Sequence, residues 1–262
     1  MLVEGREWQG RIGDRPGPEL VATAGWLALL VGCVEYDLGL AEAAEASRRK
    51  ALAWGTEAGA GEIVGWAYEM AAWFALTRDD PRAAIAAADG GLAVAGNYSV
   101  AAQLAAQKAR AWARLGDRRQ VGLALEQARA VPLDITDPGN HFVVDPGKIG
   151  FFAMDCYRIV GADELAEACA HEVLRAGTEA DGRERSPMRN AQARLTLGIL
   201  AARRGDTDTA ARYGAQALTG PRQSRPEVRA GGRELGGLLR DSSTPAVRRY
   251  LALLEELQEV VP

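Results

Sequence analysis

The side chains that could carry acid or base chemistry are few. His141 lies in the segment NHFVVDP with Asp145 four residues further on, a spacing that could bring an imidazole and a carboxylate together. Two more carboxylates, Glu69 and Asp155, could act as general acids or bases. Glu69, Asp155 and His141 are therefore the candidate catalytic residues if the protein is an enzyme. The alternative for His141 is structural: a loop histidine that caps a backbone group, with Asp145 held in a turn by Pro146.

The sequence lacks the residue patterns that usually bind metals and cofactors. His141 and His171 are the only histidines, and Cys33, Cys156 and Cys169 show no CxxC spacing, so no metal site is predicted. The sequence also has no GxxxxGK[ST] loop, no GxGxxG after a strand pattern and no GxSxG elbow. Phosphate-cradling and serine-hydrolase mechanisms need those scaffolds. No cofactor is expected.

Composition bounds the class of protein. The chain has 262 residues, 48% of them hydrophobic, and a net charge of −4, which indicates a globular chain that can bury a sizeable core. An acidic chain is a poor match for many phosphates, so no direct nucleic-acid partner is expected. The free cysteines and the charged, glycine-containing start favour a cytoplasmic protein without a membrane segment.

The segment RLTLGILAARRGDTDTAARYGAQAL, residues 194–218, shows the architecture most clearly. Two apolar runs meet at Gly205-Asp206, where glycine can take a left-handed C-cap and Asp206 with Thr207 can cap the next helix. Small residues recur on one face of each run, at Leu197-Gly198, Ala201, Ala210, Gly214 and Ala217. This pattern predicts a hairpin of two closely approaching antiparallel helices.

The same pattern recurs along the chain with turns at Gly39, Asp79, Gly116, Gly161 and Gly205. We therefore predict an all-α fold, a right-handed α-solenoid of about five to six helical hairpins. The expected divisions are a flexible lead-in over 1–17, hairpins over about 18–58, 62–96, 98–131, 148–176 and 187–219, and a C-terminal cap over 225–261. A terminal cap should have a polar outer face, as the last predicted helix does.

Two linkers are longer than a hairpin array needs. The first, Pro132 to Gly147, holds three prolines, and a long irregular segment of this kind is either functional or packed over a groove. The second, Gly177 to Pro187, is charged and is expected to be solvated.

The hairpin pattern resembles the tetratricopeptide repeat. Three segments, AGWLALLVGCVEYDLG, HFVVDPGKIGFFAMDCYRIVG and GILAARRGDTDTAARYGAQAL, are similar to the C-terminal sensor domain of bacterial XRE-type helix-turn-helix transcriptional regulators. That resemblance covers about Pro18 to Leu257 and implies a sensor that binds a ligand in its concave groove. The residues before Pro18 are too few for a helix-turn-helix, so DNA binding does not carry over.

In such an array the second, fifth, ninth and twelfth positions of each first helix face the groove. The candidate ligand-binding residues at these positions are Trp26, Tyr36, Trp66, Glu69, Trp73, Gln103, Arg110, Phe151, Asp155 and Arg158. Aromatic walls with a few convergent polar groups suit a small molecule or a peptide. The simpler interpretation is that the tryptophans are core residues and the charges pair with one another.

Three classes of function follow. The leading one is a regulatory or sensor module that binds a small molecule or peptide without catalysis. The second is a scaffold that docks another protein, including a second copy of the chain. The third is an enzyme in which Glu69, Asp155 or His141 has acquired a catalytic role in a biosynthetic pathway.

Overall fold

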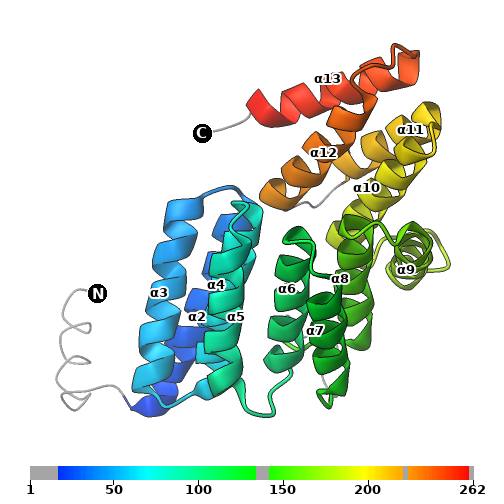
Figure 1. Cartoon of the computed structure of the whole chain (residues 1–262). Coiled ribbons are helices and arrows are strands. Elements are labelled where there is room, and N and C mark those ends of the chain that lie inside the picture. Colours follow the sequence, from blue (N-terminus) through cyan, green and yellow to red (C-terminus); the bar gives the residue numbers. More distant parts are fainter. Residues whose placement is uncertain (1–16, 134–141, 221–223, 260–262) are drawn as a thin grey trace, which may run out of the picture.

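The computed structural model describes residues 17–133, 142–220 and 224–259, and these form an all-helical array with no β-strand (Figure 1). Twelve helices in the described part pack in adjacent pairs. They are α2 (Pro18–Asp37) with α3 (Ala41–Glu57), α4 (Gly61–Thr77) with α5 (Pro81–Ala95), α6 (Val100–Arg114) with α7 (Arg118–Ala130), α8 (Pro146–Ile159) with α9 (Asp163–Ala176), α10 (Pro187–Arg203) with α11 (Thr207–Leu218), and α12 (Arg225–Leu239) with α13 (Pro245–Glu259). The predicted all-α hairpin solenoid is confirmed. Apart from Gly17, the expected lead-in lies outside the described residues.

The hairpin turns use the residues that the sequence pattern indicated. All five turn positions have positive φ, from +60° to +86°: Gly39, Asp79, Gly116, Gly161 and Gly205. Asp79 is the exception in residue type, because an L side chain in this conformation crowds the backbone. The following aspartates of three turns cap the next helix by accepting a backbone N–H: Asp80, Asp117 and Asp206.

Small residues allow the helices of a pair to approach closely. A Cβ on Gly198 of α10 would lie 3.1 Å from the carbonyl oxygen of Ala210 in α11. A Cβ on Gly214 would lie 2.5 Å from the Tyr250 ring of α13, so glycine here admits a large side chain from the next hairpin. Buried apolar clusters run along the array from α2 to α13, as the stacked pairs of a solenoid require.

The first helices of successive hairpins form the inner layer. In sequence, α2 contacts α4, α4 contacts α6, α6 contacts α8, and α8 contacts α10, while the second helices lie outside them. The array curves far enough that α12 contacts α2 and α4 as well as α10, so the last hairpin reaches back across the concave face to the first two (Figure 1). The arc is therefore closed on one side rather than open.

Helix α2 is unusually apolar for the end of an array. Among the described helices it is the one long and apolar enough to cross a membrane by length and composition. A single helix of this kind, partly buried in the fold, does not indicate a membrane protein.

Candidate functional site

A cavity of about 560 Å³ that opens to solvent lies on the concave side of the array. Its wall receives side chains from all six first helices and from the two long linkers: Leu30, Cys33, Val34, Asp37, Trp66, Glu69, Trp73, Gln103, Gln107, Arg110, Phe142, Val143, Asp145, Lys148, Phe151, Phe152, Arg185, Ser186, Pro187, Met188, Arg189, Gln192, Ser224 and Glu227. This volume is in the range of small-molecule sites. The cavity thus depends on the curvature of the whole array.

One part of the wall is aromatic. The Phe142 ring lies 5.3 Å from the Trp66 ring and 5.0 Å from the Trp26 ring, so the end of the first linker packs against α2 and α4. Phe151 and Phe152 continue this surface from α8 with ring centroids 5.2 Å apart. Flat apolar surfaces of this kind supply affinity for an organic ligand through buried area.

A second part of the wall is an ion-paired network centred on Arg110, whose guanidinium carbon lies 5.7 Å from the centroid of the Phe152 ring. Its Nε donates to Asp155 Oδ2 at 2.7 Å, and its Nη2 lies 3.3 Å from Glu227 Oε2 of α12. Trp73 Nε1 also donates to Glu227, at 3.0 Å. Burial opposes the charged form of Arg110, but the attraction of Glu227 and Asp155 outweighs burial and raises its pKa. Glu227 therefore holds α12 on the inner layer.

Asp155 and Arg158 extend this network behind the wall. Arg158 pairs with both Asp155 and Glu234 of α12. Burial alone would raise the pKa of Asp155, but the two guanidinium groups hold it well below its usual range. Asp155 is therefore a permanently charged counter-ion for two arginines, which gives it no proton to exchange near neutral pH.

The surroundings of Glu69 shift its pKa in the direction opposite to that of Asp155. It is 4% exposed, and its Oε1 accepts from the side-chain amides of Gln103 at 2.8 Å and Gln107 at 2.7 Å. Burial raises the pKa of Glu69 despite these two hydrogen bonds and the attraction of Lys148 and Arg110. A shielded carboxyl in a cavity wall is a candidate for proton exchange or for hydrogen bonding to a ligand.

Lys148 is the basic counterpart of Glu69. Its ammonium donates to the Val143 carbonyl at 3.3 Å and lies 5.6 Å from the Trp66 ring centroid. Burial, helped by repulsion from Arg189, lowers the pKa of Lys148. Arg189 itself pairs with Asp145 at 2.7 Å, and Asp145 also caps α8 by accepting from Lys148 N.

Several polar atoms of the lining residues are buried without a hydrogen-bond partner within the described structure. These are Trp66 Nε1, Gln103 Oε1, Gln192 Nε2 and Ser224 Oγ. A buried polar group without a partner costs about 1–3 kcal/mol. Each of these atoms is itself shielded, so it lies beneath the surface of the wall, and its side chain would have to rearrange before a ligand in the cavity could reach it.

The structure divides the ten sequence-predicted residues into two groups. Six line the cavity: Trp66, Glu69, Trp73, Gln103, Arg110 and Phe151. Four do not: Trp26 packs on Phe142, Tyr36 stacks on Phe74 with ring centroids 3.9 Å apart, and Asp155 and Arg158 pair behind the wall. The two interpretations of the tryptophans are not exclusive, since Trp66 is 3% exposed and still forms part of the wall.

Two of the residues that do not reach the cavity, Tyr36 and Arg158, hold the twelfth position of their helices. Tyr36 is buried against Phe74, and Arg158 contacts Glu234 of α12. Trp26 and Asp155 hold the second and ninth positions, so no single helix position accounts for all four.

Two segments that line the cavity were not predicted from the sequence. Ser224 and Glu227 belong to the last hairpin, and no local pattern indicates that it returns to the first. Arg185, Ser186 and Pro187 come from the second linker, which is solvent-exposed over residues 180–183 as expected but also contains an antiparallel bridge between Thr178 and Glu184 and contributes to the wall. The buried Asn190 amide donates to Gly177 O, which fixes the linker on α10.

The first linker does pack over the groove where it is described. Phe142, Val143 and Asp145 line the cavity, and Val144 is fully buried. His141 lies outside the described residues, so its predicted pairing with Asp145 stays a prediction.

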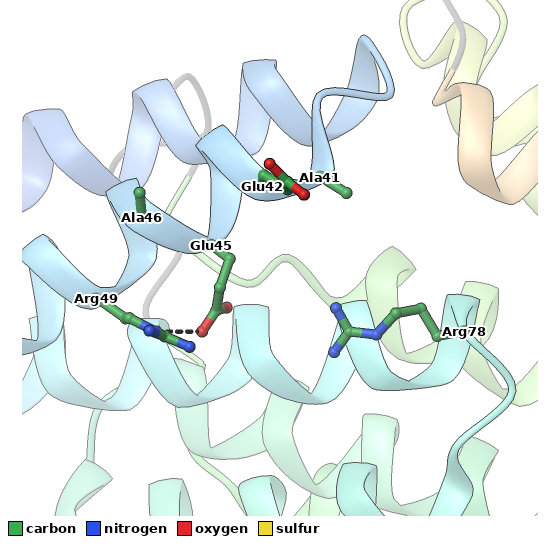
Figure 2. A pocket seen from close by; sticks show the side chains of 6 residues that line it. All are labelled: Ala41, Glu42, Glu45, Ala46, Arg49 and Arg78. Carbon is green, nitrogen blue, oxygen red and sulfur yellow. Dashed lines mark hydrogen bonds and ion pairs between the residues drawn. The ribbon is translucent and has the colours of Figure 1, made fainter. Parts of the chain in front are cut away.

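A second hollow, of about 310 Å³, lies on the outer surface between α3 and the end of α4 (Figure 2). Glu45 accepts from Arg49 at 2.8 Å and from Arg48 at 2.7 Å, and these bonds lower its pKa to about 2. Arg78 points into the hollow from the opposite side (Figure 2). The aromatic rings and the polar side chains that line the inner cavity make that cavity the candidate site.

The fold and the cavity define an α-helical hairpin solenoid with a mixed aromatic and polar cavity on its concave side. Comparison with known proteins found no matching protein family, curated protein or solved structure.

Proposed function

We propose that this protein is a sensor-type solenoid that binds a small organic molecule in the cavity on its concave side. The observation that carries the proposal is a cavity of about 560 Å³ whose lining combines five aromatic residues with buried charged and amide side chains. In line with the resemblance stated above, we propose a cytoplasmic regulatory role related to the XRE-type sensor domains.

The size of the cavity favours a small molecule over an extended peptide. Its volume of about 560 Å³ suits a single small ligand, whereas a peptide bound in an extended form needs a long groove. Glu227 joins α12 to Arg110 and Trp73 across the arc.

The charges of the wall favour a ligand without net charge. The lining includes four acidic residues, Asp37, Glu69, Asp145 and Glu227, and four basic residues, Arg110, Lys148, Arg185 and Arg189. Two of these cations are already paired with lining anions. A ligand with a net charge would add an unpaired charge to a shielded site, which is costly. A neutral or zwitterionic aromatic compound that packs on the aromatic side chains and hydrogen-bonds to the polar ones fits this wall.

An acid–base enzyme is a second candidate because one observation favours it. Glu69 and Lys148 both line the cavity, and their pKa values are displaced toward each other, up for the acid and down for the base. Groups tuned in this way are typical of catalytic sites. Asp155 does not support this candidate, since its pKa is lowered by two arginines.

Native mass spectrometry of the full chain, purified from its source without denaturation, tests the proposal. We expect a bound small molecule that is lost in Cys33→Trp, because the indole fills the cavity from α2. The control Leu165→Trp adds the same group at a residue 54% exposed on α9 and should retain the ligand. Equal occupancy in Cys33→Trp and wild type would place the ligand elsewhere. Turnover of the bound molecule during incubation would favour the enzyme.

A further inference from the structure

The exposed face of α2 and the turn after it carry the largest gathering of exposed apolar side chains in the described structure. Of thirteen large hydrophobic residues exposed there, seven lie between Leu20 and Leu40. Exposed apolar side chains scattered singly need no explanation, but a contiguous patch marks an interaction surface. The opposite end of the array shows the usual arrangement, with Arg248, Arg249, Glu255 and Glu256 on the exposed side of α13.

The exposed residues of α2 follow a regular seam. Leu20, Ala24, Leu27, Val31, Val34 and Leu38 are spaced alternately by four and three residues. This is the a/d spacing that lets one helix pack lengthwise against another. The five large side chains of the seam are each between 48% and 59% exposed. Helix α2 packs on α3, α4 and α12, and among the described helices none covers the seam.

We propose that the seam of α2 is the interface of a homodimer, in which two copies of the chain pair through their first helices. The seam is free of charged residues, because Glu19, Glu35 and Asp37 lie outside it and Glu35 accepts from Ser47 of α3. Covering the exposed halves of the five side chains in both copies buries on the order of 1,000 Å², the lower limit for a specific interface.

The identity of the partner follows from the surfaces available. A copy of the chain offers no second apolar seam among its described helices, so self-association must pair the seam with itself. Such an isologous contact is closed and stops at two copies. Helix α2 carries no lysine or arginine, which argues against attachment to an anionic membrane.

The dimer contact adjoins the cavity. Val34 belongs to the seam and also lines the cavity, and Leu30 lines the cavity while 45% exposed. The second copy therefore shields the α2 edge of the cavity, although the dimer itself does not depend on the proposed ligand.

Sedimentation velocity over a concentration series tests the dimer with the full chain. We expect wild type to shift from monomer to dimer, and Leu27→Glu and Val31→Glu to remain monomeric while their circular dichroism stays that of wild type. Leu165→Glu, the matched control on α9, should dimerise normally. A wild type that stays monomeric at all concentrations, or a Leu27→Glu variant that dimerises like wild type, overturns the proposal.

Two further measurements identify other occupants of the seam. Dimerisation only after deletion of residues 1–16 would show that this segment covers the seam in the full chain. Flotation of wild type, but not Leu27→Glu, with phosphatidylcholine vesicles would show a lipid surface as the partner. Either result overturns the homodimer.

Discussion

Replacing Arg110 by Ala should destabilise the protein far more than replacing an exposed arginine. Arg110 is 5% exposed and lies between Asp155 and Glu227, so its removal leaves two shielded carboxylates without their shared cation. Breaking a buried ion pair on one side costs about 3–5 kcal/mol. For a chain of this size that corresponds to a fall in Tm of roughly 5–10 °C.

The control is Arg49→Ala. Arg49 pairs with Glu45 on α3, but its side chain is 73% exposed, and exposed pairs contribute at most about 1 kcal/mol. Urea denaturation followed by circular dichroism gives both free energies of unfolding. If the two variants lost the same small amount, the network would not hold α12 on the inner layer.

The effect of Arg110→Ala should also depend on pH. The pKa of Asp155 is below its unfolded value in the folded protein, because the arginines outweigh the effect of burial. A lowered carboxyl pKa contributes stability above the unfolded pKa, about 3.9, and this stability is lost as pH falls through the folded value. The difference between wild type and Arg110→Ala should therefore be largest near neutral pH and shrink below about pH 4. A constant difference would show that lost packing, not charge, is responsible.

Three further predictions concern the packing, the turns and Glu69. Gly214→Ala should destabilise the protein by about 1–3 kcal/mol because its Cβ would lie 2.5 Å from the Tyr250 ring. The control Gly122→Ala, which has open space around its Cβ, should stabilise the protein by about 0.5–1 kcal/mol. Equal effects of the two substitutions in chemical denaturation would contradict the close packing at Gly214. Asp79→Gly should raise stability by about 0.5–1 kcal/mol by relieving the positive φ, and a loss in the same assay would show that the Asp79 side chain matters more than its backbone. Glu69→Gln should raise the Tm at pH 8 and leave it unchanged near pH 4, because burial raises the pKa of Glu69 and the folded state disfavours its charged form; a lower Tm at pH 8 would show that the carboxylate is needed.

Local sequence signals were sufficient for the hairpins. A glycine followed by an aspartate between two apolar runs indicates a turn and a helix cap. At Gly205 and Asp206 the structure shows the positive φ of the turn and the hydrogen bond from Thr209 N to Asp206. Counting from such turns also placed Trp66 and Arg110 correctly on the inner layer. These features depend on neighbours within one or two hairpins.

The cavity could not be predicted in the same way. Glu227 meets Trp73 across 154 residues, and this contact results from small rotations that accumulate over all the hairpins. No local sequence pattern predicts the total rotation. For the same reason Asp155, which is expected in the groove, instead lies behind the wall as a partner of Arg110 and Arg158.

The central claim is that the cavity takes a small organic molecule without net charge. Ligand-observed NMR with a fragment library that contains equal numbers of neutral, anionic and cationic members tests it most directly. We expect mostly neutral or zwitterionic aromatic fragments to bind wild type and Leu165→Trp, and their signals to vanish with Cys33→Trp. Binding that is unchanged in Cys33→Trp, or hits dominated by one sign of charge, would contradict the account.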